Sequence, residues 1–137
     1  MRSLALILVT LVSGCASVGD PRARPLKPLE VATAPYDPTV ISERIGSLFY
    51  ENGCLKFREQ GSDEMLLPVW PTGSSFNGTS LTFHEPGKSD QLILIAQQFV
   101  IKGHDIPPAV MGAGSLAPFN HQCQAPEYMV AHVQPSD

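Results

Sequence analysis

Residues 46–58 read GSLFYENGCLKFR, and this stretch decides the fold class. Asn52-Gly53 joins two runs of β-forming residues. This dipeptide is the strongest short signal of a β-hairpin, because a type I′ turn needs positive φ at both positions. Apolar and charged residues alternate over 55–58, which predicts one buried and one solvent-facing side. Cys54 falls on the solvent-facing side, so burying it would need a β-bulge beside the turn.

Further short strands are predicted around this hairpin, separated by turns rich in Gly and Pro. They lie at residues 65–70, 79–83, 91–96 and 128–133, and residues 99–101 continue the sheet after a bend at 97–98. Residues 40–45 are predicted to be a lead-in strand or one helical turn. Pro68 cannot donate to a ladder, so its strand should be an edge or carry a bulge. The apolar run 91–96 suits burial on both faces, and residues 104–122 are predicted to be an irregular loop. About six strands predict an all-β fold, either a small OB-like barrel or a sandwich.

Residues 11–15 read LVSGC and close a short apolar run that follows Arg2. This arrangement resembles a bacterial lipobox, in which the cysteine takes a diacylglycerol and the preceding peptide bond is cut. Cys15 is therefore the predicted lipidation site, and residues 1–14 are the predicted signal peptide. The run is too short to span a bilayer, which takes about 20 residues. The alternative is a plain signal peptide that leaves Cys15 as a free thiol.

The residue after the cysteine is Ala16 and not aspartate. By the same resemblance, this implies sorting to the outer membrane, with the domain facing the periplasm. Several acyl chains would make the anchor stable, because a single chain gives only marginal binding.

Residues 15–39 are predicted to form a disordered, Pro-rich tether. No period of 2 or 3.6 marks a buried face there, and the five prolines favour an extended chain. Such a segment of about 24 residues spans at most roughly 75 Å. The tether is either a plain spacer or a docking strip, and the predicted domain is residues 40–137.

With Cys15 taken by lipid, Cys54 and Cys123 remain, and an even pair in an exported chain predicts a disulfide. Closing a loop of about 70 residues stabilises a chain by about 4 kcal/mol. The alternative, two thiols serving a metal or redox site, has no CxxC spacing to support it.

Residues 53–55 (GCL) and 67–73 (LPVWPTG), followed by a late cysteine before an aromatic strand, are similar to a pattern in small exported bacterial domains of unassigned function. The similarity covers roughly residues 46–133. It implies a small, disulfide-closed β-domain and carries no activity.

The search for chemistry begins with the four histidines, His84, His104, His121 and His132. None falls in an HxH or HExxH spacing, so no metal site and no cofactor is predicted. No serine has the GxSxG frame, and Asp63-Glu64 lies in a hydrophilic turn, so no catalytic residue is predicted. The possible binding residues are Trp70, His104 and Phe119. The only tryptophan has the alternative of being a core or lid residue.

The net charge is −4, and it becomes −5 once residues 1–14 with Arg2 are removed. This mildly acidic chain lacks the basic patch that nucleic-acid binding needs, so nucleic acid is excluded as a partner. The expected partners are the membrane, through the lipid, and an envelope protein or a cell-wall glycan.

The sequence thus predicts a lipid-anchored envelope protein that is not an enzyme and acts as a binding or accessory module in the periplasm. Two alternatives stay open. One is an inhibitor or immunity lipoprotein that blocks a cell-wall-degrading enzyme with a loop. The other is a small hydrolase or metal-handling protein.

Overall fold

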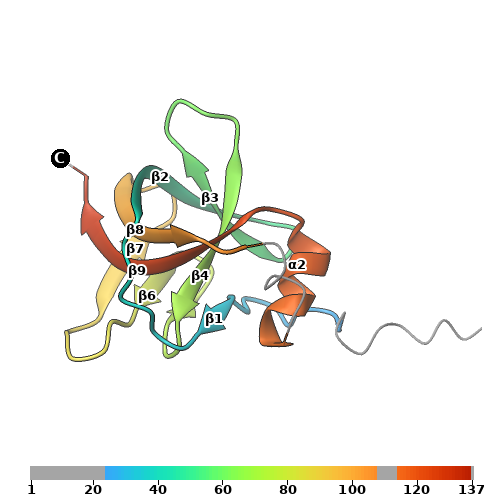
Figure 1. The fold of residues 1–137 in the computed structure, drawn as a ribbon. Coiled ribbons are helices and arrows are strands. Elements are labelled where there is room, and N and C mark those ends of the chain that lie inside the picture. Colours follow the sequence, from blue (N-terminus) through green and yellow to red (C-terminus); the bar gives the residue numbers. More distant parts are fainter. Residues whose placement is uncertain (1–23, 108–113, 137) are drawn as a thin grey trace, which may run out of the picture.

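A computed structural model describes residues 24–107 and 114–136 of the chain (Figure 1). Strands dominate it. Over the described residues they are β1 (Thr33–Ala34), β2 (Ser42–Glu51), β3 (Cys54–Glu59), β4 (Met65–Pro71), β5 (Ser75–Phe76), β6 (Ser80–Phe83), β7 (Gln91–Leu94), β8 (Phe99–Asp105) and β9 (Glu127–Pro135). A 3-10 turn, η1 (Gly114–Leu116), leads into the short helix α2 (Ala117–Cys123). The signal-peptide and lipidation predictions lie outside the described residues.

Five strands of the larger sheet close into a ring in the order β2-β3-β4-β9-β8, and β8 pairs back to β2. Neighbouring strands are antiparallel except β4 and β9, which are parallel. The predicted all-β class with one disulfide is confirmed. Residues 40–45 belong mostly to β2, so the helical turn considered there is wrong.

A second sheet, β5-β6-β7, lies between β4 and β8 in the chain and packs against the core of the ring. Its buried side chains join the same cluster as the ring's aromatic residues, and the members from this sheet are Phe76, Leu81, Phe83 and Ile93. The expected burial of both faces over 91–96 is wrong. Only one face of β7 packs on the core, while Leu92 and Leu94 on the other face are 63% and 52% exposed.

The hairpin that opens the ring is confirmed. Asn52 and Gly53 have φ of 52° and 78°, as a type I′ turn requires, and Glu51 pairs with Cys54 across it. The predicted bulge is absent, because the register between β2 and β3 runs unbroken from the turn to Glu59. Leu55 packs in the ring's interior and Cys54 in a second cluster, so both neighbours are buried on opposite faces.

The second cluster lies outside the ring, beneath α2. It gathers Leu67, Val69, Leu116 and Phe119 around the disulfide. The predicted disulfide between Cys54 and Cys123 is confirmed, with the two Cα atoms 5.8 Å apart. The prediction of an irregular loop over 104–122 is wrong for residues 104–105, which end β8, and for residues 114–122. This second segment forms η1 and α2, because its apolar side chains have the outer face of the ring to cover.

Pro68 lies within β4, which is not an edge strand. Leu67 N donates to Pro126 O beside β9, whereas Trp70 N donates to Ala32 O beside β1. Backbone N–H groups alternate sides along a strand, so the Pro68 nitrogen faces the side of β1 and β3. There it falls between the last β3 pair at Leu66 and the first β1 pair at Trp70. A change of partner strand therefore accommodates the proline.

Residues 24–39 differ from the predicted tether. Thr33 and Ala34 form the parallel strand β1 against β4, Ala32 is buried in the outer cluster, and Leu26 packs against that cluster. The buried part of this segment is too short to show a periodic pattern in the sequence, yet it packs against the ring. Residues 35–41, the crossing segment, then pass over the outer side of β9 to the start of β2 (Figure 1).

Replacing Ala32 with aspartate is expected to lower the free energy of unfolding by about 2 kcal/mol, because the carboxylate would have to enter an apolar cluster or release β1 from β4. Urea unfolding measures this change. The exposed Val40, directly after this segment, provides the control as V40D. Equal stability of the two variants would mean that residues 24–39 do not belong to the folded domain.

Candidate functional site

The predicted binding residues are not brought together. Trp70 is fully buried in the ring, with its indole 6.1 Å from the Phe83 ring in an edge-to-face arrangement. Phe119 lies on α2 and is buried in the outer cluster around the disulfide. Neither side chain is placed to contact a ligand, so their assignment as binding residues does not hold, and Trp70 is a core residue.

His104, the third predicted residue, holds the crossing segment. Its Nε2 lies 3.0 Å from Asp37 Oδ2 and its Nδ1 lies 3.0 Å from Asp105 O. The backbone contact at Asp105 and then the Asp37 carboxylate raise the pKa of His104. Hydrogen bonds from Thr39, followed by that from His104, lower the pKa of Asp37 to about 2. The His104 and Asp37 side chains therefore bind each other and nearby groups of the chain. We conclude that His104 holds the crossing segment in place.

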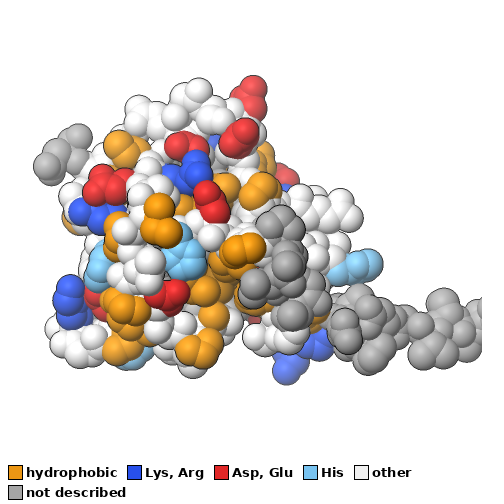
Figure 2. All heavy atoms as spheres, in the orientation of Figure 1, with side chains coloured by type: hydrophobic (Ala, Val, Ile, Leu, Met, Phe, Trp, Pro, Cys, Tyr) orange, Lys and Arg blue, Asp and Glu red, His pale blue; other side chains and the backbone are white. Residues whose placement is uncertain are grey.

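A second contact of the crossing segment centres on Glu85, which is buried. Its Oε1 accepts a hydrogen bond from the Tyr36 hydroxyl at 3.0 Å and lies 2.5 Å from His132 Nδ1, and its Oε2 lies 3.3 Å from Lys88 Nζ. Burial alone would raise the pKa of Glu85, but the hydrogen bonds from Tyr36 and Lys88 lower it. Figure 2 shows histidine side chains beside acidic ones on this face.

The histidines of the described residues therefore pair mainly with single carboxylates. His84 does so as well, with Nδ1 2.8 Å from Asp90 Oδ1. Within residues 24–107 and 114–136, no group of three or more His, Cys, Asp or Glu side chains is arranged to hold a metal ion.

Replacing His104 with asparagine is expected to destabilise the protein more at pH 5 than at pH 8. A histidine with a raised folded pKa contributes stability below its unfolded value of 6.5, and this is lost as the pH rises through the folded value. Asp37 contributes above its ordinary value of 3.8, and its contribution is lost as the pH falls toward 2. The pair therefore acts mainly between pH 4 and 6.5. Urea unfolding at both pH values measures the difference.

The exposed His121 gives the matched control as H121N, because it makes no ion pair with the residues that the structure describes. An H104N effect that is the same at pH 5 and pH 8 would show that only packing is lost.

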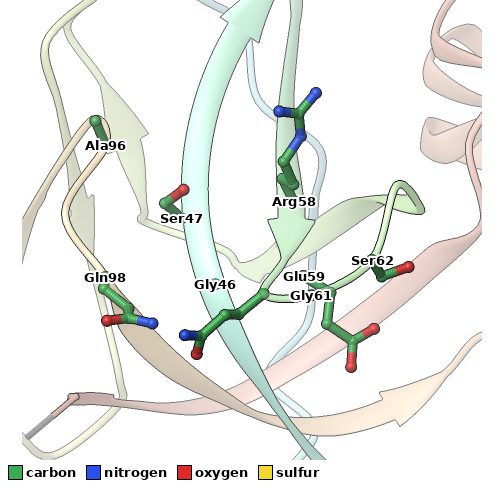
Figure 3. A pocket seen from close by; sticks show the side chains of 9 residues that line it. Gly46, Ser47, Arg58, Glu59, Gly61, Ser62, Ala96 and Gln98 are labelled. Carbon is green, nitrogen blue, oxygen red and sulfur yellow. The ribbon is translucent and has the colours of Figure 1, made fainter.

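A groove that the sequence does not predict crosses β2 on the outside of the ring (Figure 3). Its floor is Gly46-Ser47 of β2. One wall is the turn between β7 and β8, with Ala96 and Gln98, and the other is residues 58–62 at the end of β3 and in the turn that follows. The volume is about 220 Å³. This is enough for a small polar group and less than the roughly 300–1,000 Å³ of a site for a drug-sized molecule.

The chain forms this groove through a close approach of backbones. Gly46 pairs with Glu59 on one side and Phe99 on the other. A Cβ at Gly46 would lie 2.0 Å from Arg58 O, so only glycine fits there. Gln60 N donates to Ile45 O at 2.7 Å and fixes the turn after β3 over the groove's edge.

The two charged residues of the groove differ in whether an ion pair engages them. The Glu59 carboxylate is paired with Arg44, with Nη1 2.9 Å from Oε2. The Arg58 guanidinium lies over the Phe49 ring, 5.7 Å from its centroid. The other side-chain donors and acceptors of the lining are uncharged and come from Ser47, Gln60, Ser62 and Gln98. The arrangement suits hydrogen bonding to a ligand, with one positive charge available.

Glu127 is another residue that sequence reasoning missed. It begins β9 and is 1% exposed, on the outer side of the ring, because its neighbour Tyr128 packs in the interior. Neither carboxylate oxygen has a hydrogen-bond partner within the described residues, and burial raises the pKa of Glu127 to about 7. The signal available in the sequence was an acidic residue directly before the predicted apolar strand 128–133.

No family model, curated protein or solved structure matches this chain. None of the helices among the described residues is long and apolar enough to cross a bilayer. The function is therefore argued from the residues of the chain.

Proposed function

We propose that this chain is a lipid-anchored protein of the bacterial cell envelope whose β-domain is a non-enzymatic binding or accessory module. The groove over Gly46 carries the binding part of the proposal, since hydrogen-bonding groups from three separate segments converge on one recess. The partner is an envelope protein or a cell-wall glycan.

The location rests on two features. Residues 11–15 resemble a lipobox, with Cys15 as the acceptor. The other two cysteines of the chain are joined in a disulfide, a bond that persists in exported proteins and is rare in the cytosol. Both features support export with one cysteine left for acylation.

Growth with labelled palmitate is expected to label the wild-type chain and to leave C15S unlabelled. The wild type should sediment with membranes, while C15S should stay in the supernatant, because several acyl chains are needed for stable anchoring. Mass spectrometry of the N-terminus gives the chemical state directly. An unacylated wild-type chain that still begins at Met1 would contradict the proposed anchor.

The binding role is tested in cells with a photocrosslinking residue at position 98, in the wall of the groove. Crosslinking there is expected to yield one defined product of higher mass, because a ligand in the groove contacts this position. Ser89 provides the control position, as it is exposed and does not line the groove. Equal crosslinking at both positions, or none at position 98, would contradict the proposed site.

One observation favours the inhibitor as the second candidate. The turn between β3 and β4 projects from the body of the domain, and it exposes Asp63 and Glu64 near its tip (Figure 1). A projecting loop is what insertion into an enzyme's cleft requires. The domain would then inhibit a peptidoglycan-degrading enzyme at near-stoichiometric amounts. D63K/E64K should abolish this inhibition, whereas S89K on an exposed loop elsewhere should leave it unchanged.

A further inference from the structure

We infer that the groove recognises a carboxylate group and that Arg58 is the residue that binds it. This inference deepens the proposed function and rests on the groove being the binding site. The ligand is an anion with a planar carboxylate, supplied either by the C-terminus of a peptide or by an acidic sugar.

The first argument is that Arg58 differs from the other arginines of the described residues. Arg24 pairs with Glu30, and Arg44 lies between Glu59 and Asp105 at 2.9 and 3.4 Å. Arg58 has no carboxylate within ion-pair distance in the part of the chain that the structure describes. In a domain with an excess of acidic residues, this leaves one guanidinium available to an outside anion.

The second argument is that the guanidinium is held in place. Arg58 pairs in register with Ser47, and the two side chains lie on the same outer face of β2 and β3 (Figure 3). The Phe49 ring lies beneath the cation at 5.7 Å, a distance at which cation–π attraction acts. The planar fork of an arginine takes both oxygens of a carboxylate, so restricting its position favours this form of binding.

The third argument is the balance of charge and size. Glu59, the acidic residue of the lining, is paired with Arg44, so Arg58 is the charged residue of the lining that no ion pair within the described residues engages. The uncharged amides and hydroxyls of Ser47, Gln60 and Gln98 supply further hydrogen bonds. A volume of about 220 Å³ corresponds to about seven water molecules, which fits one terminal residue or one sugar acid and no longer segment.

The test is titration of the full-length chain with matched pairs of probes. N-acetyl-Ala-Ala with a free carboxylate is compared with its amide, and glucuronic acid is compared with glucose. NMR shifts of the Arg58 side-chain Nε–H and the Gln98 side-chain amide follow binding. At least one acid is expected to bind about tenfold or more tightly than its neutral counterpart, and this preference should weaken as salt is added. Which acid binds distinguishes the peptide source from the sugar source.

The variant R58Q should lose the preference. K56Q is the matched control, because Lys56 lies two residues earlier on the same face of β3, pairs with Glu51 at 3.8 Å and does not line the groove. An acid preference that survives in R58Q, or equal binding of acid and neutral probes, would overturn the inference while leaving the groove as a binding site. Absence of binding by all four probes would also overturn it, and crosslinking at position 98 then decides the proposed function separately.

Discussion

Replacing both Cys54 and Cys123 with alanine is expected to lower the free energy of unfolding by about 4 kcal/mol. The two residues are 69 positions apart, and a crosslink over such a loop restricts the unfolded chain strongly. In the folded state the bridge fastens α2 to the first hairpin, over a cluster with few large side chains. Guanidinium unfolding of the variant and the oxidised wild type measures the loss.

C15S serves as the control for this variant, because it removes a cysteine that takes no part in the disulfide. Treatment of the wild type with a reductant should reproduce the effect of the double alanine variant. A loss below about 1 kcal/mol in both experiments would show that the outer cluster holds α2 without the bridge, since disulfides of this loop size seldom contribute so little.

Replacing Glu127 with glutamine is expected to stabilise the protein by about 3 kcal/mol at pH 8 and by much less at pH 5. The folded state holds the proton of Glu127 up to a pKa of about 7, whereas the unfolded chain releases it near 4.5. A carboxyl group with a raised folded pKa favours folding at low pH. The wild type therefore loses stability as the pH rises from about 4.5 to 7, and above 7 the loss is constant. Glutamine has nearly the same shape and does not titrate.

Urea unfolding at pH 5, 6, 7 and 8 measures the difference between E127Q and the wild type. The exposed Glu64 gives the control as E64Q, whose effect should be small at every pH. A difference for E127Q that does not change with pH would show that the carboxyl group keeps its ordinary ionisation in the folded protein.

Local signals in the sequence predicted the local structure well. Asn52-Gly53 gave the first hairpin because its turn geometry depends on two residues alone. Two long-range contacts were predicted incorrectly or missed. Leu92 looked buried, but no element covers that face of β7. Ala32 was expected in an exposed tether, but the residues after it pair with β4 and Ala32 is buried in the outer cluster. The burial of these two residues depends on which elements pack against each other in the folded chain.

The groove, which is the candidate site, could not be predicted from local sequence patterns either. Its floor and walls come from residues 46–47, 58–62, and 96 and 98, and no spacing within one segment marks them as a set. The alternation over 55–58 did place Arg58 on the solvent side. What the sequence lacked was the sheet closure that sets Gln98 across β2 from this arginine.

The packing of residues 24–39 on the ring limits the distance between the proposed lipid anchor and the folded domain. On the proposed anchor, only nine peptide units separate Cys15 from Arg24, and a chain of that length reaches at most about 30 Å when fully extended. A free chain up to residue 39 would have allowed roughly 75 Å. With that anchor, the domain would be confined to the layer of periplasm next to the bilayer, and a ligand of its groove would have to be present within that layer.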